Sequence, residues 1–474
     1  MDSLLANRDM AFLSRDLVRL NTKASVPAEL SAYRWPGPDV PALRALWTEL
    51  EFHSFLKDLS DAPNAPNTPG TPNTPGASSS ADTAERLPTS GFRLVGDEAG
   101  LAELMAHIRA LPPDDLRLAV DTETDGLDTR HARLVGVSLA VSPEEAWYLP
   151  CGHQDALGQR LPGQLSPEAL TSALRPLLTN HGIFKIGHNL KFDMAILASE
   201  RNGGIRLAGP LYDTMVGAWL LDPETRSLKL DDLMAEQGFR MTSFAEVTQG
   251  DKSADAFTRV SLNAARDYSC EDVAAALLLH EFQWPLLAEA GLCDWMAEAE
   301  CPCIPVLADM EAAGVAVDAE TLRALGEEFG RRMTEMEARI HEVAGVDFNI
   351  ASPKQLGEVL FERLGLPRGR KTKTGWSTDV KVLEKLAPEH ELPALVLAHR
   401  NLAKLKNTYV DRLLELRDPV SGRVRSSFNQ CCTATGRLSS SNPNVQNIPV
   451  RTEEGRRIRA AFVAPPGHVL VSAD

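Results

Sequence analysis

The sequence predicts an α/β domain followed by a mainly helical region, and three observations lead to this prediction. From about residue 91 to 290, short β-like runs alternate with helical ones, which is typical of α/β domains. From about 298 to 420 the apolar pattern is mostly helical, with little strand signal until Val469–Ser472. Residues 62–80 form a near-repeat of Pro, Asn, Thr, Gly and Ser that cannot build a core, so they mark a linker.

The individual elements follow from these patterns in chain order. A helical stretch over 42–56 precedes the linker, because its apolar residues recur at spacings of three and four. In the α/β domain the alternation of apolar residues predicts four strands, at Leu116–Glu123, Leu134–Val141, Ala146–Leu149 and Ile183–Gly187. Helical periodicity predicts three helices, at Leu190–Glu200, Leu211–Leu221 and Leu262–Leu279.

Length and composition restrict the class of protein. A chain of 474 residues is too long for a single hydrophobic core, which suggests two to four domains. No apolar run reaches ~18 residues, and no basic region precedes an apolar run at the N-terminus, so we expect a cytoplasmic protein without a membrane partner. The seven cysteines show no CxxC pair and no zinc spacing, which favours buried reduced thiols over a metal or redox site at Cys301-Pro-Cys303.

Charge is distributed unevenly along the chain. The formal net charge is −16, which at first argues against a nucleic-acid partner. Residues 331–474, however, carry 23 Lys and Arg against 16 Asp and Glu, a net charge of +7, which leaves −23 for the first 330 residues. This division fits a metal-dependent nuclease followed by a segment that holds a nucleic-acid duplex.

Three blocks in the α/β region place acids where they could hold metal ions. Asp121 and Glu123 project from the same face of a predicted strand, where two carboxylates repel each other unless a cation lies between them. Asp193 lies in the first turn of the helix after the fourth strand, and Tyr268 and Asp272 share a helix face. Taken singly, each block also fits a polar strand end, a helix N-terminal acid or an ordinary amphipathic surface.

Together, in this order, the three blocks resemble the proofreading 3′→5′ exonucleases, a ribonuclease-H-like family with a mixed sheet flanked by helices. The resemblance implies that Asp121, Glu123 and Asp272 hold one divalent ion and that Asp121 and Asp193 hold a second, either Mg²⁺ or Mn²⁺. It also implies that Tyr268 positions the attacking water. Asp267 and Glu271 flank the motif but point elsewhere on the helix, and Asp213 is expected to support structure.

The second half contains basic and amide-rich runs. Residues 368–373 form a basic, Gly-containing loop, and the run Leu402–Tyr409 contains Lys404, Lys406, Asn407 and Thr408; each alone also fits a solvated surface. The run from Thr433 to Pro449, leading into Val471-Ser-Ala-Asp474, resembles the palm entry of the bacterial DNA polymerase I family. The resemblance implies that residues 402–409 belong to the thumb and that Lys404, Lys406, Asn407, Thr408, Arg437, Asn444, Gln446 and Asn447 contact primer–template DNA. It also implies that Asp474 is a polymerase metal ligand.

The resemblance divides the chain into a remnant of a 5′-nuclease domain (1–60), a linker (61–90), a 3′→5′ exonuclease domain (91–295), a thumb (296–425) and the start of a palm (426–474). We therefore expect a DNA polymerase I-family chain, truncated at both ends, that acts in DNA replication and repair. In the present chain we expect exonuclease activity without 5′-nuclease activity or primer extension. The expected partners are a primer–template duplex and a single-stranded 3′ end, with deoxynucleoside triphosphates only in a full-length form. We also expect a monomer that associates with the bacterial nucleoid through DNA. The alternatives are a non-catalytic DNA-binding fragment and an RNA-trimming exonuclease of the same fold.

Overall fold

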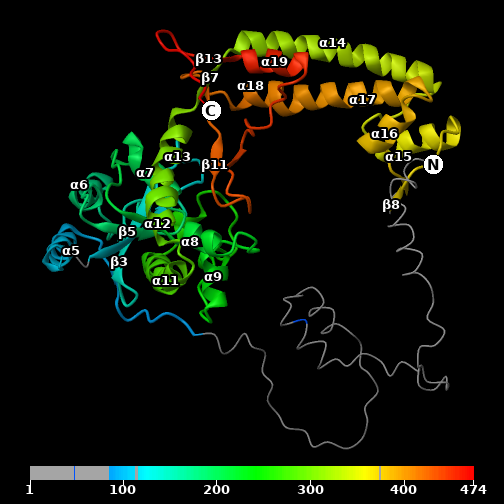
Figure 1. Cartoon of the computed structure of the whole chain (residues 1–474). Helices are drawn as coiled ribbons and strands as arrows, with labels where there is room; N and C mark the ends of the chain where they lie inside the picture. Colours follow the sequence, from blue (N-terminus) through cyan, green and yellow to red (C-terminus); the bar gives the residue numbers. More distant parts are fainter. Residues whose placement is uncertain (1–46, 48–84, 113–115, 373–374, 474) are drawn as a thin grey trace, which may run out of the picture. The chain divides into compact units, whose positions relative to one another are not determined.

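The computed structural model describes residues 47, 85–112, 116–372 and 375–473 (Figure 1). The predicted helix over 42–56 (apart from Trp47), the predicted linker over 62–80 and Asp474 lie outside the described residues. The chain divides into two units between Ser78 and Ser79. The architecture below is that of the second unit.

A six-stranded mixed sheet forms the centre of the first domain in this unit. Its order is β1-β4-β3-β2-β5-β6, with β3 antiparallel to β2 and β4 and the remaining pairs parallel. The strands are β1 (Phe92–Leu94), β2 (Arg117–Thr124), β3 (Leu134–Ser142), β4 (Glu145–Pro150), β5 (Phe184–Gly187) and β6 (Leu211–Asp213). The four predicted strands are therefore confirmed, while β1 and β6 were not predicted.

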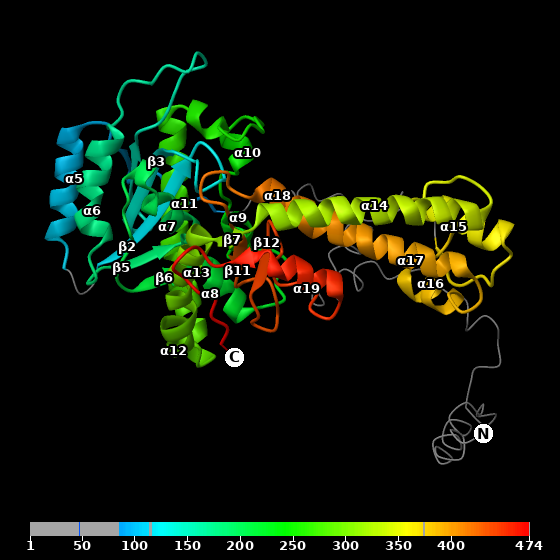
Figure 2. The ribbon, with the colours of Figure 1, turned by 90° about the horizontal axis from the view of Figure 1, so that it is seen from above.

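Helices cover both faces of this sheet, as the predicted fold requires. Helices α5 (Glu98–Ala110) and α6 (Pro167–Leu178) lie on one side, and the long α11 (Leu262–Glu289) crosses the other (Figures 1 and 2). Helix α7 (Leu190–Ala198) follows β5, and α8 (Thr214–Leu221) follows β6. The predicted helix Leu211–Leu221 was wrong at its start, because Leu211–Asp213 pairs with β5 and Asp213 caps α8.

Smaller elements complete this domain and lead out of it. They are η2 (Glu200–Asn202), α9 (Leu230–Glu236), α10 (Phe244–Val247), η3 (Ala256–Arg259), α12 (Cys293–Trp295), the π-helix η4 (Met296–Glu300) and α13 (Cys301–Ala313). Helix α13 contacts α7 and so joins this domain to the second half. Of the seven cysteines, four are buried as predicted, but Cys432 is exposed.

The second half is mainly helical, which confirms that prediction. Helix α14 (Ala319–Ala344) packs along α17 (Glu391–Lys404) and the π-helix η6 (Leu405–Asp411), which continues into α18 (Arg412–Leu416; Figure 2). The other helices are α15 (Pro353–Glu358), the π-helix η5 (Val359–Arg363), α16 (Val380–Leu386) and α19 (Glu453–Ala460). Two apolar clusters stabilise the two ends of this helical layer, one around Phe329 and Tyr409 and one around Ile340 and Leu360.

Short strands also occur in this half, where little strand signal was expected. They are β7 (Val315–Val317), β8 (Lys371–Thr372), β9 (Gly375–Trp376), β10 (Arg423–Val424), β11 (Ser427–Asn429), β12 (Ser439–Ser441) and β13 (Phe462–Val463). They form the sheet β10-β7-β13 and the hairpins β8-β9 and β11-β12. The strand-like segment Val469–Ser472 pairs with no strand of the described chain, and Val469, Leu470 and Val471 are exposed. Among the described helices, none has the length and apolarity needed to cross a bilayer.

Candidate active site and nucleic-acid interface

Strand β2 carries the first two acids of the candidate active site. The strand is apolar and fully buried over Leu118, Ala119 and Val120 before Asp121 and Glu123 emerge on one face. Together with Asp272 of α11, each offers a carboxylate oxygen, and these three oxygens all lie within 4.8 Å of one another. The structure therefore brings together the three acids that were predicted to share a metal ion.

Asp193 lies beside this cluster on α7. Thr122 holds its side chain, and Asp213 holds the start of its helix. Asp193 Oδ1 accepts hydrogen bonds from the Thr122 backbone N–H at 2.9 Å and from the Thr122 hydroxyl at 2.6 Å. The helix itself begins after Asn189, which adopts the left-handed region at φ 63°. The Asp213 carboxylate accepts hydrogen bonds from Asn189 N (3.0 Å) and Leu190 N (2.8 Å), which confirms its supporting role.

Helix α11 supplies the remaining predicted residues. Tyr268 and Asp272 lie four residues apart and meet on one face, where the phenol hydroxyl interacts with the carboxylate. The Tyr268 ring also packs against Phe244 and Phe257, with ring centroids 6.4 and 5.7 Å away. These contacts hold the hydroxyl toward the acids.

Burial and mutual repulsion raise the pKa values of these acids. Burial raises the pKa of Asp121 to about 6. Burial, followed by the charge of Asp121, raises the pKa of Glu123, Asp193 and Asp272 well above their usual range. Burial and the neighbouring carboxylates also raise the pKa of Tyr268, so the phenol stays neutral at neutral pH. A neutral phenol can orient a water molecule but is a poor base.

The donor set fits divalent metal ions. Within the described chain, no lysine or arginine forms an ion pair with Asp121, Glu123, Asp193 or Asp272. Converging buried carboxylates without a counter-charge are unfavourable, and oxygen ligands of this kind suit Mg²⁺ or Mn²⁺. Asp193 uses only Oδ1 for Thr122, which leaves Oδ2 available as a ligand.

Two supporting residues were not predicted from the sequence. Ser269 is fully buried, and its hydroxyl donates to Glu123 Oε1 at 2.7 Å, which orients that carboxylate. Thr122 holds Asp193 as described above. Ser269 lies three residues before Asp272 on α11, so its helical spacing could have indicated it. Nothing in the sequence shows that Thr122 meets α7. The flanking Glu271 points away, as predicted, and accepts a hydrogen bond from Thr242 N at 2.7 Å.

The predicted DNA-contacting residues of the thumb lie at the junction of α17 and η6. Lys404, Asn407 and Thr408 are exposed. Lys406 is less available, because its ammonium binds both carboxylate oxygens of Asp411 at 2.7 and 3.0 Å. In the basic loop at 368–373, Arg368 and Lys371 lie over the Trp376 ring.

The predicted contacts of the palm run lie on the β11-β12 hairpin and the turn after it. Arg437 and Asn447 are exposed. Asn444 and Gln446 are exposed as well. Asn444 Oδ1 accepts hydrogen bonds from Gln446 N at 3.1 Å and Asn447 N at 3.2 Å, and Gln446 Nε2 donates to the Leu438 carbonyl at 3.0 Å. These two amides therefore shape the turn. Tyr409 of η6 donates its hydroxyl to the Asn447 carbonyl at 2.6 Å, which brings η6 and the turn after β12 together.

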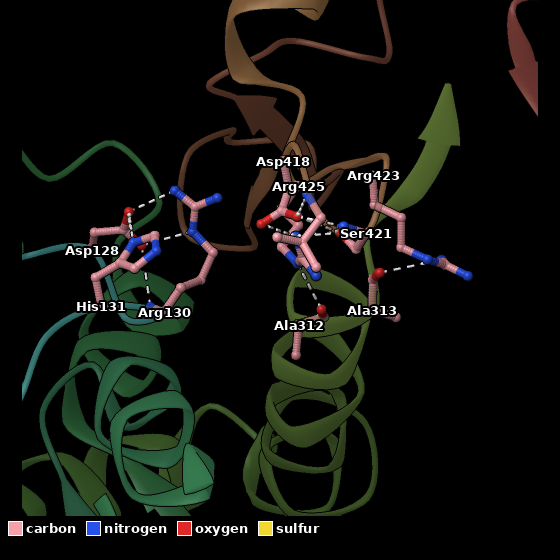
Figure 3. A network of polar contacts seen from close by, with 10 residues as sticks. Asp128, Arg130, His131, Ala312, Ala313, Asp418, Ser421, Arg423 and Arg425 are labelled. Atoms are coloured by element: carbon pink, nitrogen blue, oxygen red, sulfur yellow. Dashed lines mark hydrogen bonds and ion pairs between the residues drawn. The ribbon is translucent and has the colours of Figure 1, made fainter. Parts of the chain in front are cut away.

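Two polar loops also lie near each other at the border of the domains (Figure 3). Arg130 pairs with Asp128 in the loop after β2, and the charge of Asp418 contributes to raising the pKa of Arg130. After the turn at Asp418, Arg425 Nε donates to the Ala312 carbonyl at 2.9 Å and Arg423 Nη1 to the Ala313 carbonyl at 3.2 Å. These donors satisfy the free carbonyls at the end of α13 and fix β10 to that helix.

Comparisons with known proteins agree with this geometry. Residues 92–288 match the family described as 3′-5′ exonuclease, and residues 319–474 match the family described as DNA polymerase family A. DNA polymerase I of Pseudomonas aeruginosa is 39% identical over 473 residues, which cover 99% of this chain and 50% of that protein. The chain belongs to DNA polymerase family A. The exonuclease match includes every acid of the candidate active site.

Other family A members show the same extent of similarity. DNA polymerase I of Geobacillus stearothermophilus is 33% identical over 100% of this chain and 49% of its own length. The chain thus spans about half the length of the relatives it matches. Among solved structures, the POL domain of Pol1 from M. smegmatis, in complex with DNA primer-template and dNTP, has a TM-score of 0.64 and 31% identity, covering 80% of this chain and 59% of that one. All predicted DNA-contacting residues, from Lys404 to Asn447, fall within the family A match.

Proposed function

We propose that the first domain is a 3′→5′ exonuclease that removes nucleotides from DNA 3′ ends. The observation that carries this proposal is the convergence of Asp121, Glu123 and Asp272 within 4.8 Å on two elements, with Asp193 beside them. The match to the 3′-5′ exonuclease family over residues 92–288 supports it. The similarity to DNA polymerases supports DNA as the substrate.

Each residue has a distinct role in this proposal. Asp121, Glu123 and Asp272 would hold one divalent ion, and Asp121 with Asp193 a second. Such a metal pair would supply activation of a water molecule and stabilisation of negative charge on a leaving 3′ oxygen. Tyr268, kept neutral by its surroundings, orients the water through its hydroxyl. Ser269 and Thr122 hold the carboxylates in the geometry that the ions require.

We further propose that the second half holds the primer–template duplex. Exposed Lys404 provides a sequence-independent phosphate contact, while Arg437 and Asn447 contact the backbone or minor groove. We propose that this segment belongs to a DNA polymerase that uses deoxynucleoside triphosphates in replication and repair, as the match to DNA polymerase family A over residues 319–474 supports. The M. smegmatis structure with primer-template and dNTP supports this role.

A metal-dependent exonuclease assay tests the proposal directly. The purified chain should shorten a 5′-labelled single-stranded oligonucleotide from its 3′ end with Mg²⁺ or Mn²⁺, and EDTA should stop the reaction. Asp121→Ala and Asp272→Ala should each abolish cleavage, because each removes a carboxylate of the cluster. Asp267→Ala, at a flanking acid outside the cluster, is the matched control. If both cluster variants kept wild-type rates, the site assignment would be wrong; if the wild type bound DNA but never cleaved it, the chain would be a DNA-binding fragment.

A further inference from the structure

A charged junction connects the exonuclease helix α7 to the β11-β12 hairpin. Lys191 lies on α7, two residues before Asp193. Its ammonium contacts Glu311 Oε1 of α13 at 2.5 Å and also donates to the Phe428 carbonyl in β11. The same Glu311 oxygen accepts a hydrogen bond from Phe428 N at 2.6 Å. Three elements from distant parts of the chain therefore meet at one ion pair.

This junction is sheltered enough to constrain its partners. The side chains of Lys191 and Glu311 are each only 20% exposed, so water and salt screen the pair less than an exposed one. Hydrogen bonds that involve charged groups are also stronger than neutral ones. Both backbone groups of Phe428 are bound here, which fixes β11 at this residue in position and direction.

The connection between β11 and β12 makes further contacts with the exonuclease side directly after β11. Gln430 Nε2 donates to Glu300 Oε2 at 2.7 Å and to the Glu300 carbonyl at 3.2 Å. Cys431 is buried in the core cluster of the exonuclease domain. The hairpin that carries Arg437 is thus anchored to the nuclease domain at its first strand, while its second strand leads toward the turn held by Tyr409.

Lys191 projects from the side of α7 opposite to Asp193 and does not reach the acid cluster. Residues two positions apart on an α-helix project ~200° apart, so Lys191 points away from the side that Asp193 presents to the cluster. Lys191 therefore acts through the position of α7. On one side of α7, Asp193 binds Thr122, and on the other side Lys191 binds the β11-β12 hairpin at Phe428.

We propose that Lys191 is a positioning residue that couples the β11-β12 hairpin to the exonuclease site. It keeps a fixed distance between the segment that holds the duplex and the acid at Asp193, so that a frayed 3′ end reaches the metal-binding acids while the duplex stays bound. The proposal rests on the exonuclease and duplex-binding functions proposed above, and it assigns to Lys191 a specific effect on duplex substrates.

Comparing two substrates tests this coupling. A short single-stranded oligonucleotide engages only the exonuclease site, whereas a primer–template with a mispaired 3′ end engages the hairpin as well. For Lys191→Met, the loss of kcat/KM should be ~10-fold greater on the primer–template than on the single strand. Glu311→Gln should show the same substrate-dependent loss. The double variant should lose no more kcat/KM than either single variant, because each of the three variants disrupts the same junction. Lys191→Arg should restore part of the activity on the duplex.

The controls make each outcome decisive. Lys252→Met, at an exposed lysine outside the junction, should leave the ratio between the two substrates unchanged. Cleavage of the single strand also reports that each variant is folded, and Glu311→Gln replaces Lys191→Met if the latter does not fold. Equal losses on both substrates, or no loss on either, would overturn the coupling. A wild-type chain that cleaves neither substrate would instead refute the exonuclease function on which it rests.

Discussion

Replacing Asp121 by Asn should stabilise the metal-free protein above about pH 6 while it abolishes exonuclease activity. Asp121 contributes to the raised pKa values of Glu123, Asp193 and Asp272, so it is the acid whose charge the whole cluster opposes. Asparagine keeps the shape of the side chain and removes the charge. Without metal ions, the clustered carboxylates should therefore lower the free energy of unfolding. Neutralising one of these carboxylates should raise it again.

The magnitude follows from the geometry and from the pKa. Two unit charges no more than 4.8 Å apart repel by at least ~3.5 kcal/mol at an effective dielectric constant of ~20, and burial independently disfavours the charged form of Asp121. A pKa raised from 3.8 to about 6 corresponds to ~3 kcal/mol at 1.36 kcal/mol per unit. Because the folded-state pKa is raised, the stability is fully present below the unfolded pKa and is lost as pH rises through about 6. Relative to the wild type, Asp121→Asn should thus gain about 2–3 kcal/mol between pH 4 and pH 8.

Urea unfolding in EDTA at several pH values measures this difference. The free energy is obtained from the shift in midpoint at constant slope. Asp267→Asn, at an exposed flanking acid paired with Arg266, should show no such pH-dependent gain. Added Mg²⁺ should stabilise the wild type by ~2.7 kcal/mol at a concentration of 100 times the Kd, and Asp121→Asn by less. A wild-type-to-variant difference that stays constant from pH 4 to pH 8 would refute the electrostatic reasoning.

Three further predictions concern individual side chains. Ser269→Ala should lower exonuclease kcat by ~10-fold, because Glu123 loses the donor that orients it, and a titration of Mn²⁺ should show weaker metal binding. Tyr268→Phe should lower kcat without changing the Mn²⁺ affinity, since the phenol orients water and binds no metal; a matching loss of metal affinity would contradict that role. Lys404→Ala should reduce the slope of log K against log salt by ~0.9 in duplex-binding titrations, and Lys406→Ala should reduce it less, because Lys406 is paired with Asp411. Equal changes for the two lysines would show that the Asp411 pair does not limit DNA contact.

The clustering of Asp121, Glu123 and Asp272 was predictable because its signals are local. The apolar run before Asp121 marks a buried strand, and the four-residue spacing of Tyr268 and Asp272 marks one helix face. The contacts that refine the site depend on tertiary structure. Thr122 meets Asp193 only because β2 and α7, 71 residues apart at these positions, are brought together by the fold.

Elements of two or three residues escaped prediction for a physical reason. Strand β6 is only Leu211–Asp213, too short for an alternating pattern, so its residues merged with the apolar helix that follows. The same holds for β7 and β10 in the second half. Conversely, Val469–Ser472 has the composition of a strand but forms no ladder within the described residues, since composition alone supplies no pairing partner. Lys406 carries the charge expected of a DNA contact, and only the structure shows that Asp411 neutralises it.

The π-helix η6 implies that the register of the continuous helix α17-η6-α18 is adjustable. A π-turn accommodates one more residue than the α-helical hydrogen-bonding pattern would, and it sits between α17 and α18, directly after Lys404. Deleting a single residue within Leu405–Asp411 would let the backbone return to ordinary α-helical bonding, whereas a deletion in regular helix would turn everything beyond it by ~100°. A deletion of one residue within this segment would therefore leave the helix intact. Tyr409 is the residue that such a deletion must spare, because its hydroxyl donates to the Asn447 carbonyl.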